Sequence, residues 1–225
     1  MTYKITIDGP SGTGKGYVAQ EISKRLGFLH LDTGAMYRAF TLYCKNNNIT
    51  INDEEGLNTA IDKVKIDFVY DENSVKTILN GTNVSLDIRT GEISLLTSKF
   101  AALPKVREAM VKRQREYAGS NNIVVDGRDA GSVVFPKANL KIFLTASVET
   151  RAKRRYDELV AKDQSVVFEE VLESTKKRDE MDSSRSISPL VKTEDMIEVD
   201  TTNLNKEQVV EKVLELIKQK GLGKC

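Results

Sequence analysis

Apolar and polar segments alternate along the chain in a way that predicts strands separated by helices. Short apolar segments bounded by turn residues are typical of buried strands, and we expect them at 3–8, 28–31, 122–125, 140–144 and 196–199. The helix after the first strand should carry Val18, Ile22 and Leu26 on one face and end at Gly27. This alternation predicts right-handed βαβ units and a parallel sheet.

Further helical segments complete this pattern. We expect them at about 33–44, 92–118 and 149–181, the last of which is rich in charged residues. Asp32 or Thr33 is suited to cap the first of these helices, and Pro104 breaks the second. The final helix of the chain should carry an apolar stripe between Val209 and Ile217.

Residues 62–88 depart from this alternation. Apolar residues at every second position from 64 to 70 predict a half-buried strand, and Asn80-Gly81 predicts a tight hairpin. The expected strands of this region lie at 64–70, at 75–79 and around Val84 and Leu86, with a turn at 71–74. We therefore expect 62–88 to form a small antiparallel meander inserted into the chain.

Composition narrows the class of protein. A chain of 225 residues allows one domain, with or without an insertion, or two small ones, and 40% apolar with 30% charged residues excludes a disordered protein. The longest apolar run, residues 100–103, is too short to cross a membrane, and the interrupted apolar opening predicts no secretory signal. Cys44 and Cys225 form neither a disulfide framework nor a zinc site, so we expect a reduced, cytoplasmic setting.

The charges point to phosphate rather than to nucleic acid. A net charge of +1 excludes a broad basic surface that binds nucleic acid non-specifically, and 6% aromatic residues without Trp argue against stacking platforms for single strands. Nine of the twelve arginines lie between Arg107 and Arg185. Arginine is suited to a planar, bidentate grip on phosphate, so this concentration predicts an anionic ligand.

A glycine-rich turn between the first predicted strand and its helix matches the phosphate-binding pattern G-x-x-x-x-G-K at residues 9–15. Glycines let backbone N–H groups converge on an anion, and the helix N-terminus adds partial positive charge. Lys15 supplies a full charge to the β- and γ-phosphates. Gly16 stands where a Ser or Thr usually helps to hold Mg²⁺. The predicted phosphate-binding residues are Gly9, Pro10, Ser11, Gly12, Thr13, Gly14, Lys15, Gly16 and Tyr17.

At this point the chain resembles the nucleoside monophosphate kinases and, segment by segment, the bacterial cytidylate kinases. The segments that carry the resemblance are GPSGTGKG (9–16), LDTGAMYR (31–38), VDGRDAGSVVFP (125–136) and KRDEMDSSRSISPL (177–190). The resemblance covers almost the whole chain. It departs from the family at Tyr17, which takes the place of a Thr, and in the closing segment, where relatives often carry more Arg and this chain has Met181, Ser183 and Ser184.

The resemblance implies one α/β domain of the P-loop type. Its five-stranded parallel sheet is flanked by helices and carries the inserted antiparallel meander and a helical lid. The implied core spans about 1–32, 105–150 and 185–225, the monophosphate-binding insert about 33–104, and the lid about 151–184. Lid closure would exclude water before transfer, because water would otherwise hydrolyse ATP.

The implied reaction moves the γ-phosphoryl group of Mg²⁺-ATP to CMP or dCMP. The two nucleotides bring together roughly six negative charges, so a site that joins them needs Mg²⁺, a phosphate-binding loop and several arginines. The acceptor oxygen is already an oxyanion, and a general base is therefore unnecessary. His30, the one histidine of the chain, is accordingly expected to be structural.

The resemblance also implies a role for each site residue. The implied catalytic residues are Lys15, Arg128, Arg154, Arg178 and Arg185. The implied ATP-binding arginines are Arg151, Arg154 and Arg155. The acceptor phosphate would be held by Thr33, Arg38, Arg128 and Arg185, the ribose by Arg178 and Asp182, and the base by Ser98, Arg107 and Asp129. No direct metal ligand is implied, and the candidates for the second shell of Mg²⁺ are Asp32 and Asp126.

The choice of base has a physical interpretation. Cytosine presents an amino donor beside ring acceptors, which suit the Asp129 carboxylate on one side and Arg107 and Ser98 on the other. Uracil places a carbonyl where that amino group was, facing the carboxylate. The resemblance implies ATP with CMP or dCMP as substrates and a monomeric protein, and we expect no nucleic-acid or membrane partners.

Two alternatives remain open from the residues alone. The chain could phosphorylate another small acceptor, such as UMP, AMP or a hydroxyl compound whose proton Asp32 or Asp126 would accept. It could also be a nucleotide-dependent switch. The sequence lacks the N-K-x-D stretch with which GTPases recognise their base, which disfavours the switch. It also has more arginine than one phosphate ligand requires, which favours a second phosphate ligand instead.

Overall fold

The computed structural model describes residues 2–71, 75–161 and 165–222, which form two compact units. The first unit contains Met1–Leu31 with Arg115–Cys225, and the second contains Asp32–Gln114. Within the described residues, no helix is both long and apolar enough to cross a bilayer.

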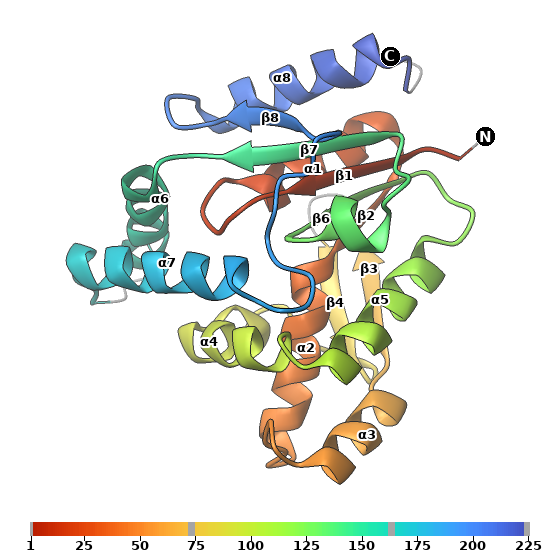
Figure 1. The fold of residues 1–225 in the computed structure, drawn as a ribbon, viewed down its shortest axis with the longest axis vertical. Helices are drawn as coiled ribbons and strands as arrows, with labels where there is room; N and C mark the ends of the chain where they lie inside the picture. The colour runs from red at the N-terminus through yellow and green to blue at the C-terminus, as the bar shows by residue number, and fades with distance from the viewer. Residues whose placement is uncertain (1, 72–74, 162–164, 223–225) are drawn as a thin grey trace. The chain divides into compact units, whose positions relative to one another are not determined.

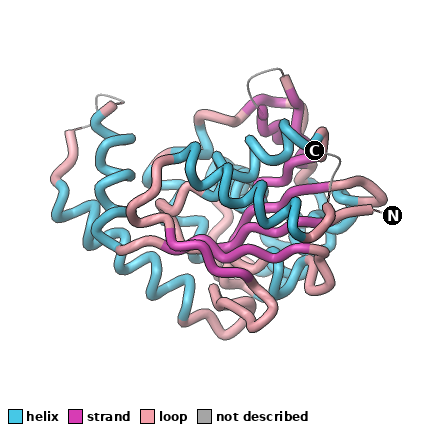
Figure 2. The backbone as a smooth tube through the Cα atoms, turned by 90° about the horizontal axis from the view of Figure 1, so that it is seen from above, coloured by secondary structure: helices cyan, strands magenta, loops and turns pink. Residues whose placement is uncertain are grey.

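A five-stranded sheet with the order β2-β6-β1-β7-β8 forms the centre of the first unit. Its strands are β1 (Lys4–Asp8), β2 (Leu29–Asp32), β6 (Ile123–Gly127), β7 (Leu140–Thr145) and β8 (Ile197–Asp200). The ladders β1–β6, β1–β7 and β7–β8 are all parallel, and Figure 2 shows the strands side by side. The predicted parallel sheet is confirmed, with each strand within one or two residues of its expected bounds.

Helices α1 (Lys15–Leu26) and α8 (Lys206–Gln219) lie against each other and against this sheet (Figure 1). Their apolar faces form one buried cluster with the strands, and this cluster includes Ile5, Ile22, Ile142 and Val213. The predicted apolar stripes of both helices are therefore confirmed. Gly27 ends α1 with a φ of 65°, a left-handed conformation that glycine adopts without strain.

The charged segment 149–181 is helical as predicted, and it forms two helices. These are α6 (Val148–Val160) and α7 (Phe168–Ser183), which contact each other and cross in the view of Figure 1. The rings of Tyr156 and Phe168 meet edge to face with centroids 5.9 Å apart. Val167, a β-branched residue with extended backbone, immediately precedes α7, and such residues favour a helix boundary over a helix interior.

The second unit contains helices, a short 3₁₀ turn and a small sheet. Its helices are α2 (Thr33–Asn46), α3 (Glu54–Lys63), α4 (Gly91–Phe100) and most of α5 (Pro104–Ala118), and the 3₁₀ turn is Asp87–Arg89. The Asp32 side chain caps α2 by accepting the Ala35 N–H at 2.8 Å, as the sequence predicts. Pro104 begins α5, which confirms the predicted break.

The predicted antiparallel meander is confirmed as strands β3 (Ile66–Tyr70), β4 (Val75–Leu79) and β5 (Thr82–Asn83). Asn80 and Gly81 have φ of 48° and 84°, the left-handed pair that a tight hairpin requires. The third strand, expected around Val84 and Leu86, forms slightly earlier, at Thr82–Asn83. Leu86 is 85% exposed and precedes the 3₁₀ turn instead. Residues 72–74 of the expected turn lie outside the described residues.

Helix α3 was not predicted. It begins after Asp53, whose side chain accepts the Gly56 N–H at 2.9 Å, and it buries Leu57 and Ala60. Two buried positions in ten residues give a weak helical pattern, so the segment has no strong signal in the sequence.

Candidate functional site

The phosphate-binding loop connects β1 to α1, and its backbone requires glycine. Gly9, Gly12 and Gly14 have φ of 149°, 81° and 86°. A Cβ atom at Gly9 would lie 2.1 Å from the Leu144 carbonyl oxygen, and one at Gly12 would lie 2.8 Å from Cβ of Arg151. The loop therefore has the tight, glycine-dependent shape that directs backbone N–H groups toward an anion at the start of a helix.

Lys15 is the first residue of α1 and is only 9% exposed. Its Nζ donates to the Pro10 carbonyl oxygen at 3.0 Å, and the same oxygen accepts from Oγ1 of Thr13 at 3.0 Å. Burial and then the neighbouring Arg128 lower the pKa of Lys15 from 10.5 to about 7. An anion bound at this loop would favour the charged form of Lys15 and so oppose the effects of burial and of Arg128 on its pKa. The site is therefore electrostatically suited to phosphate.

Asp126 lies near the carboxyl end of β6, beside the strand that leads into the loop. Its Oδ1 lies 2.8 Å from Nε2 of His30, and its Oδ2 would lie 3.7 Å from a Cβ atom at Gly16. A carboxylate oxygen at this place fits a Mg²⁺ ion that is carried by nucleotide phosphates and keeps several waters. Among the described residues, no group of three or more His, Cys, Asp or Glu side chains is placed to hold a metal.

Asp182 joins two of the predicted phosphate-binding arginines. Its Oδ2 accepts from Nε of Arg128 at 2.8 Å, and its Oδ1 accepts from Nη2 of Arg185 at 3.1 Å. Burial acts to raise the pKa of Asp182, but Arg128, Arg185 and Arg178 together hold it below its ordinary value of 3.8. Asp182 therefore stays ionised and fixes the directions of both guanidinium groups.

Two arginines of α6 contact the phosphate-binding loop through its carbonyl oxygens. Arg151 is buried, donates from Nη1 to Ser11 at 3.3 Å and pairs with Asp179 of α7 at 2.7 Å. Arg154 donates to the Thr201 carbonyl oxygen at 2.6 Å and to Gly12 at 3.4 Å. The third, Arg155, pairs with Glu158 at the surface. Their predicted role toward ATP stays a prediction, and the contacts link α6 to the phosphate-binding loop.

The second unit carries the other predicted acceptor-binding residues. The Asp32 carboxylate that caps α2 also accepts from Nη2 of Arg38 at 2.9 Å, which fixes that guanidinium near the start of α2. Arg107 is 3% exposed, donates to the Ala101 carbonyl oxygen at 3.1 Å and lies 5.2 Å from the centre of the Tyr37 ring. Ser98 is half-buried on α4.

The predicted site residues therefore divide between the units. The first unit holds the phosphate-binding loop, Arg151, Arg154, Arg155, Arg128, Asp129, Arg178, Asp182, Arg185 and Asp126. The second unit holds Asp32, Thr33, Arg38, Ser98 and Arg107. Their individual roles stay predictions.

One residue of this region was missed by the sequence reasoning. Asp8 is the last residue of β1, is fully buried, and accepts the N–H groups of Ala130 and Gly131 at 2.8 and 2.7 Å. Burial raises the pKa of Asp8 to about 7, an effect that these two hydrogen bonds oppose. The sequence feature that could have identified Asp8 is a carboxylate at the end of an apolar strand, directly before a phosphate-binding loop.

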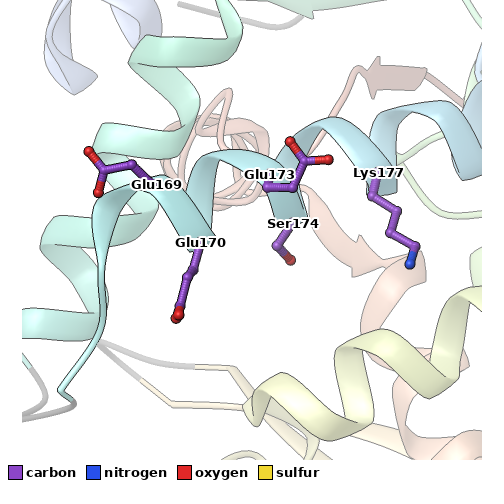
Figure 3. A pocket seen from close by; sticks show the side chains of 5 residues that line it. All are labelled: Glu169, Glu170, Glu173, Ser174 and Lys177. Carbon is purple, nitrogen blue, oxygen red and sulfur yellow. The ribbon is translucent and has the colours of Figure 1, made fainter.

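A hollow of about 510 Å³ lies along α7, and none of the candidate site residues lines it. Figure 3 shows its lining side chains, which all come from one helix and are Glu169, Glu170, Glu173, Ser174 and Lys177. Three carboxylates would repel nucleotide phosphates, so we do not place a substrate there.

Comparison with known proteins gives one family. The family described as Cytidylate kinase matches residues 5–219. A cytidylate kinase of Carboxydothermus hydrogenoformans is 48% identical over 218 residues, which cover 97% of this chain and 98% of that protein. A cytidylate kinase of Bacillus subtilis is 44% identical over 217 residues, which cover 96% of this chain and 97% of that protein.

A solved structure supports the fold. A gluconokinase from Sinorhizobium meliloti has a TM-score of 0.51 at 12% identity, covering 96% of this chain and 92% of that chain. At this identity the likeness concerns the fold alone. The family match and the high identity over nearly the whole length are the stronger findings, and by them this chain belongs to the cytidylate kinase family of phosphotransferases.

Proposed function

We propose that this protein transfers the γ-phosphoryl group of Mg²⁺-ATP to CMP or dCMP, giving ADP with CDP or dCDP. The observation that carries the proposal is the set of cations around the phosphate-binding loop. Arg128 and Arg178 are close enough to Lys15 to lower its pKa, so a lysine and two arginines share one electrostatic environment. Such a concentration of positive charge suits two anionic substrates better than one.

Catalysis would rest on positioning and charge neutralisation. Lys15 and the loop N–H groups would hold the β- and γ-phosphates, while Arg128 and Arg185, fixed by Asp182, would hold the acceptor phosphate. Mg²⁺, with Asp126 near its water shell, would neutralise the charge that develops on the phosphoryl oxygens. The acceptor is an oxyanion, so no side chain needs to remove a proton. His30 is buried against Asp126, which supports a structural role.

We also propose the finer properties that the family resemblance implies. The core would span about 1–32, 105–150 and 185–225, with an insert at 33–104 that binds the monophosphate and a lid at 151–184. The protein would act as a monomer in the cytoplasm on small-molecule substrates.

The base preference is expected to depend on Asp129. Asp129→Ala should reduce the preference for CMP over UMP by about ten-fold before it abolishes turnover, because the carboxylate that accepts from the cytosine amino group is lost. The measurement is kcat/KM for both acceptors. Asp62→Ala, an exposed site on α3, is the control. An unchanged CMP-to-UMP ratio in Asp129→Ala would remove this residue from the base site.

ATP binding is expected to take up protons near neutral pH. The pKa of Lys15 is lowered to about 7, and bound phosphates would raise it again by favouring the ammonium form. Between pH 7 and 10.5 the complex should therefore bind more protons than the free protein, and ATP affinity should fall as pH rises through this window. Calorimetry at pH 8 in two buffers of different ionisation enthalpy measures the uptake. Equal heats in both buffers would contradict the assignment.

The lid is expected to close over bound substrates. Proteolysis within residues 149–181 should slow when ATP and CMP bind together, because closure orders the helices against the loop that Arg151 already contacts. Limited proteolysis with no nucleotide, each nucleotide alone and both together measures this. Cleavage at one constant rate in all four samples would show that the segment does not act as a lid.

One assay separates the proposed function from its alternatives. ADP release is followed with Mg²⁺-ATP and, in turn, CMP, dCMP, UMP, AMP, gluconate as a hydroxyl acceptor, or no acceptor. We expect rapid release with CMP and dCMP and little without an acceptor. Preference for UMP, AMP or gluconate would establish another acceptor class, and release that needs no acceptor would favour a nucleotide-dependent switch.

A further inference from the structure

The backbone after β6 is bound to the end of β1 by one side chain. Each carboxylate oxygen of Asp8 accepts one N–H group, Oδ1 from Ala130 at 2.8 Å and Oδ2 from Gly131 at 2.7 Å. The three residues are fully or almost fully buried. They are separated by more than 120 positions in the sequence, so this contact is specific to the folded chain.

The packing around Gly131 leaves no room for a side chain. A Cβ atom there would lie 2.6 Å from Oγ1 of Thr6, 3.0 Å from Cε of Met196 and 3.2 Å from Oδ2 of Asp8. The turn of residues 130–134 is a single π-helical turn, a distortion that is frequent at functional sites. The loop backbone therefore lies directly against the end of β1, in contact with Asp8.

We propose that Asp8 is a positioning residue that fixes the loop carrying Arg128 and Asp129 relative to the phosphate-binding loop. Asp8 is joined to Gly9 by the chain and to Ala130 and Gly131 by hydrogen bonds. It therefore connects the loop that would hold ATP to the loop that would hold the acceptor. This inference rests on the proposed function of Arg128 and Asp129 in binding the acceptor.

A direct chemical role for Asp8 fits the geometry less well. The side chain is fully buried and each of its oxygens already accepts an N–H group, so it presents no accessible acceptor to substrate or metal. The pair of donors also explains the residue type. A carboxylate has two acceptor oxygens, whereas an asparagine has one and would direct its NH₂ group at a backbone N–H.

The test compares three variants of the whole chain. Asp8→Asn removes one acceptor. Gly131→Ala keeps Asp8 but pushes the loop away from it. Thr6→Val is the matched control on β1, because among the described residues its hydroxyl oxygen has no hydrogen-bond partner and the replacement preserves its shape. The measured quantities are kcat and the separate KM values for CMP and ATP at saturating Mg²⁺.

We expect Asp8→Asn and Gly131→Ala to raise the KM for CMP about ten-fold while the KM for ATP changes less than about two-fold. Thr6→Val should change neither. A ten-fold change corresponds to about 1.4 kcal/mol, within reach of one lost hydrogen bond. The double variant should be little worse than either single one, because both break the same contact.

Each other outcome has a distinct meaning. If both KM values rise equally, or neither rises, Asp8 does not position the acceptor loop. If Asp8→Asn does not fold, Gly131→Ala decides the question with Asp8 in place. If the unaltered protein shows no CMP-dependent ADP release, the proposed function fails, and that result is recognised before any variant is compared.

Discussion

Replacement of Lys15 by methionine is expected to lower kcat/KM for phosphoryl transfer by about 10²–10³-fold, the usual effect of removing one preorganised group that stabilises transition-state charge. Methionine has nearly the length of lysine and fills the same buried space, but it brings no charge to the β- and γ-phosphates. The assay is ADP release with Mg²⁺-ATP and CMP. Lys24→Met, at an exposed position of the same helix, is the matched control and should retain full activity.

The same substitution is expected not to destabilise the protein. Burial lowers the pKa of Lys15 to about 7, so between pH 7 and 10.5 the unfolded chain binds more protons and stability rises with pH. Lys15→Met should abolish that rise and keep or increase the free energy of unfolding at pH 7. A variant that loses less than ten-fold in activity, or that unfolds at pH 7, would contradict the role assigned to Lys15.

Replacement of Asp182 by alanine should weaken both CMP binding and the fold. Asp182 is the common partner of Arg128 and Arg185, and removing one partner of a buried ion pair costs about 3–5 kcal/mol. In a chain of this length that loss lowers the melting temperature by about 6 °C or more. The two guanidinium groups would lose their fixed directions, and the KM for CMP should rise at least about ten-fold.

The pH dependence of Asp182→Ala gives an independent check. The pKa of Asp182 is lowered in the folded protein, so its contribution to stability is present above the unfolded value of 3.8 and is lost as pH falls toward the folded value. The difference in stability between the two proteins should therefore shrink below pH 4. Asp157→Ala, which breaks a surface pair with Lys153, is the control and should cost about 1 kcal/mol at most. Equal effects of the two substitutions would contradict the buried role.

Local patterns of apolar residues, proline and glycine in the sequence were sufficient to predict most of the fold. The apolar stripe of α1, the break at Pro104 and the turn at Asn80-Gly81 each depend on residues close together in the sequence, and each is confirmed. Helix α3 has only Leu57 and Ala60 buried and gave no comparable pattern. The helical character of 149–181 was predicted, but not where α6 ends and α7 begins, because a charged helical pattern continues on both sides of residues 161–167.

The part of the candidate site that a sequence motif determines, the phosphate-binding loop, could be predicted. The contacts between segments that are far apart in the sequence could not. The loop at 9–15 needs glycines because its backbone has positive φ at three positions, so its sequence pattern alone was sufficient to predict it. The hydrogen bonds of Asp8 to Ala130 and Gly131, and of Asp182 to Arg128, join residues far apart in the sequence. A single sequence carries no record of such pairs, and only the folded chain reveals why those carboxylates are present.

The central claim is that the phosphoryl group passes from ATP to CMP rather than to water. The most direct measurement is the amount of CDP and ADP formed together from Mg²⁺-ATP and CMP, separated by anion-exchange chromatography. We predict one CDP for each ADP from the earliest time points, and little ADP when CMP is omitted. ADP formed at the same rate with and without CMP, with no CDP, would contradict the account.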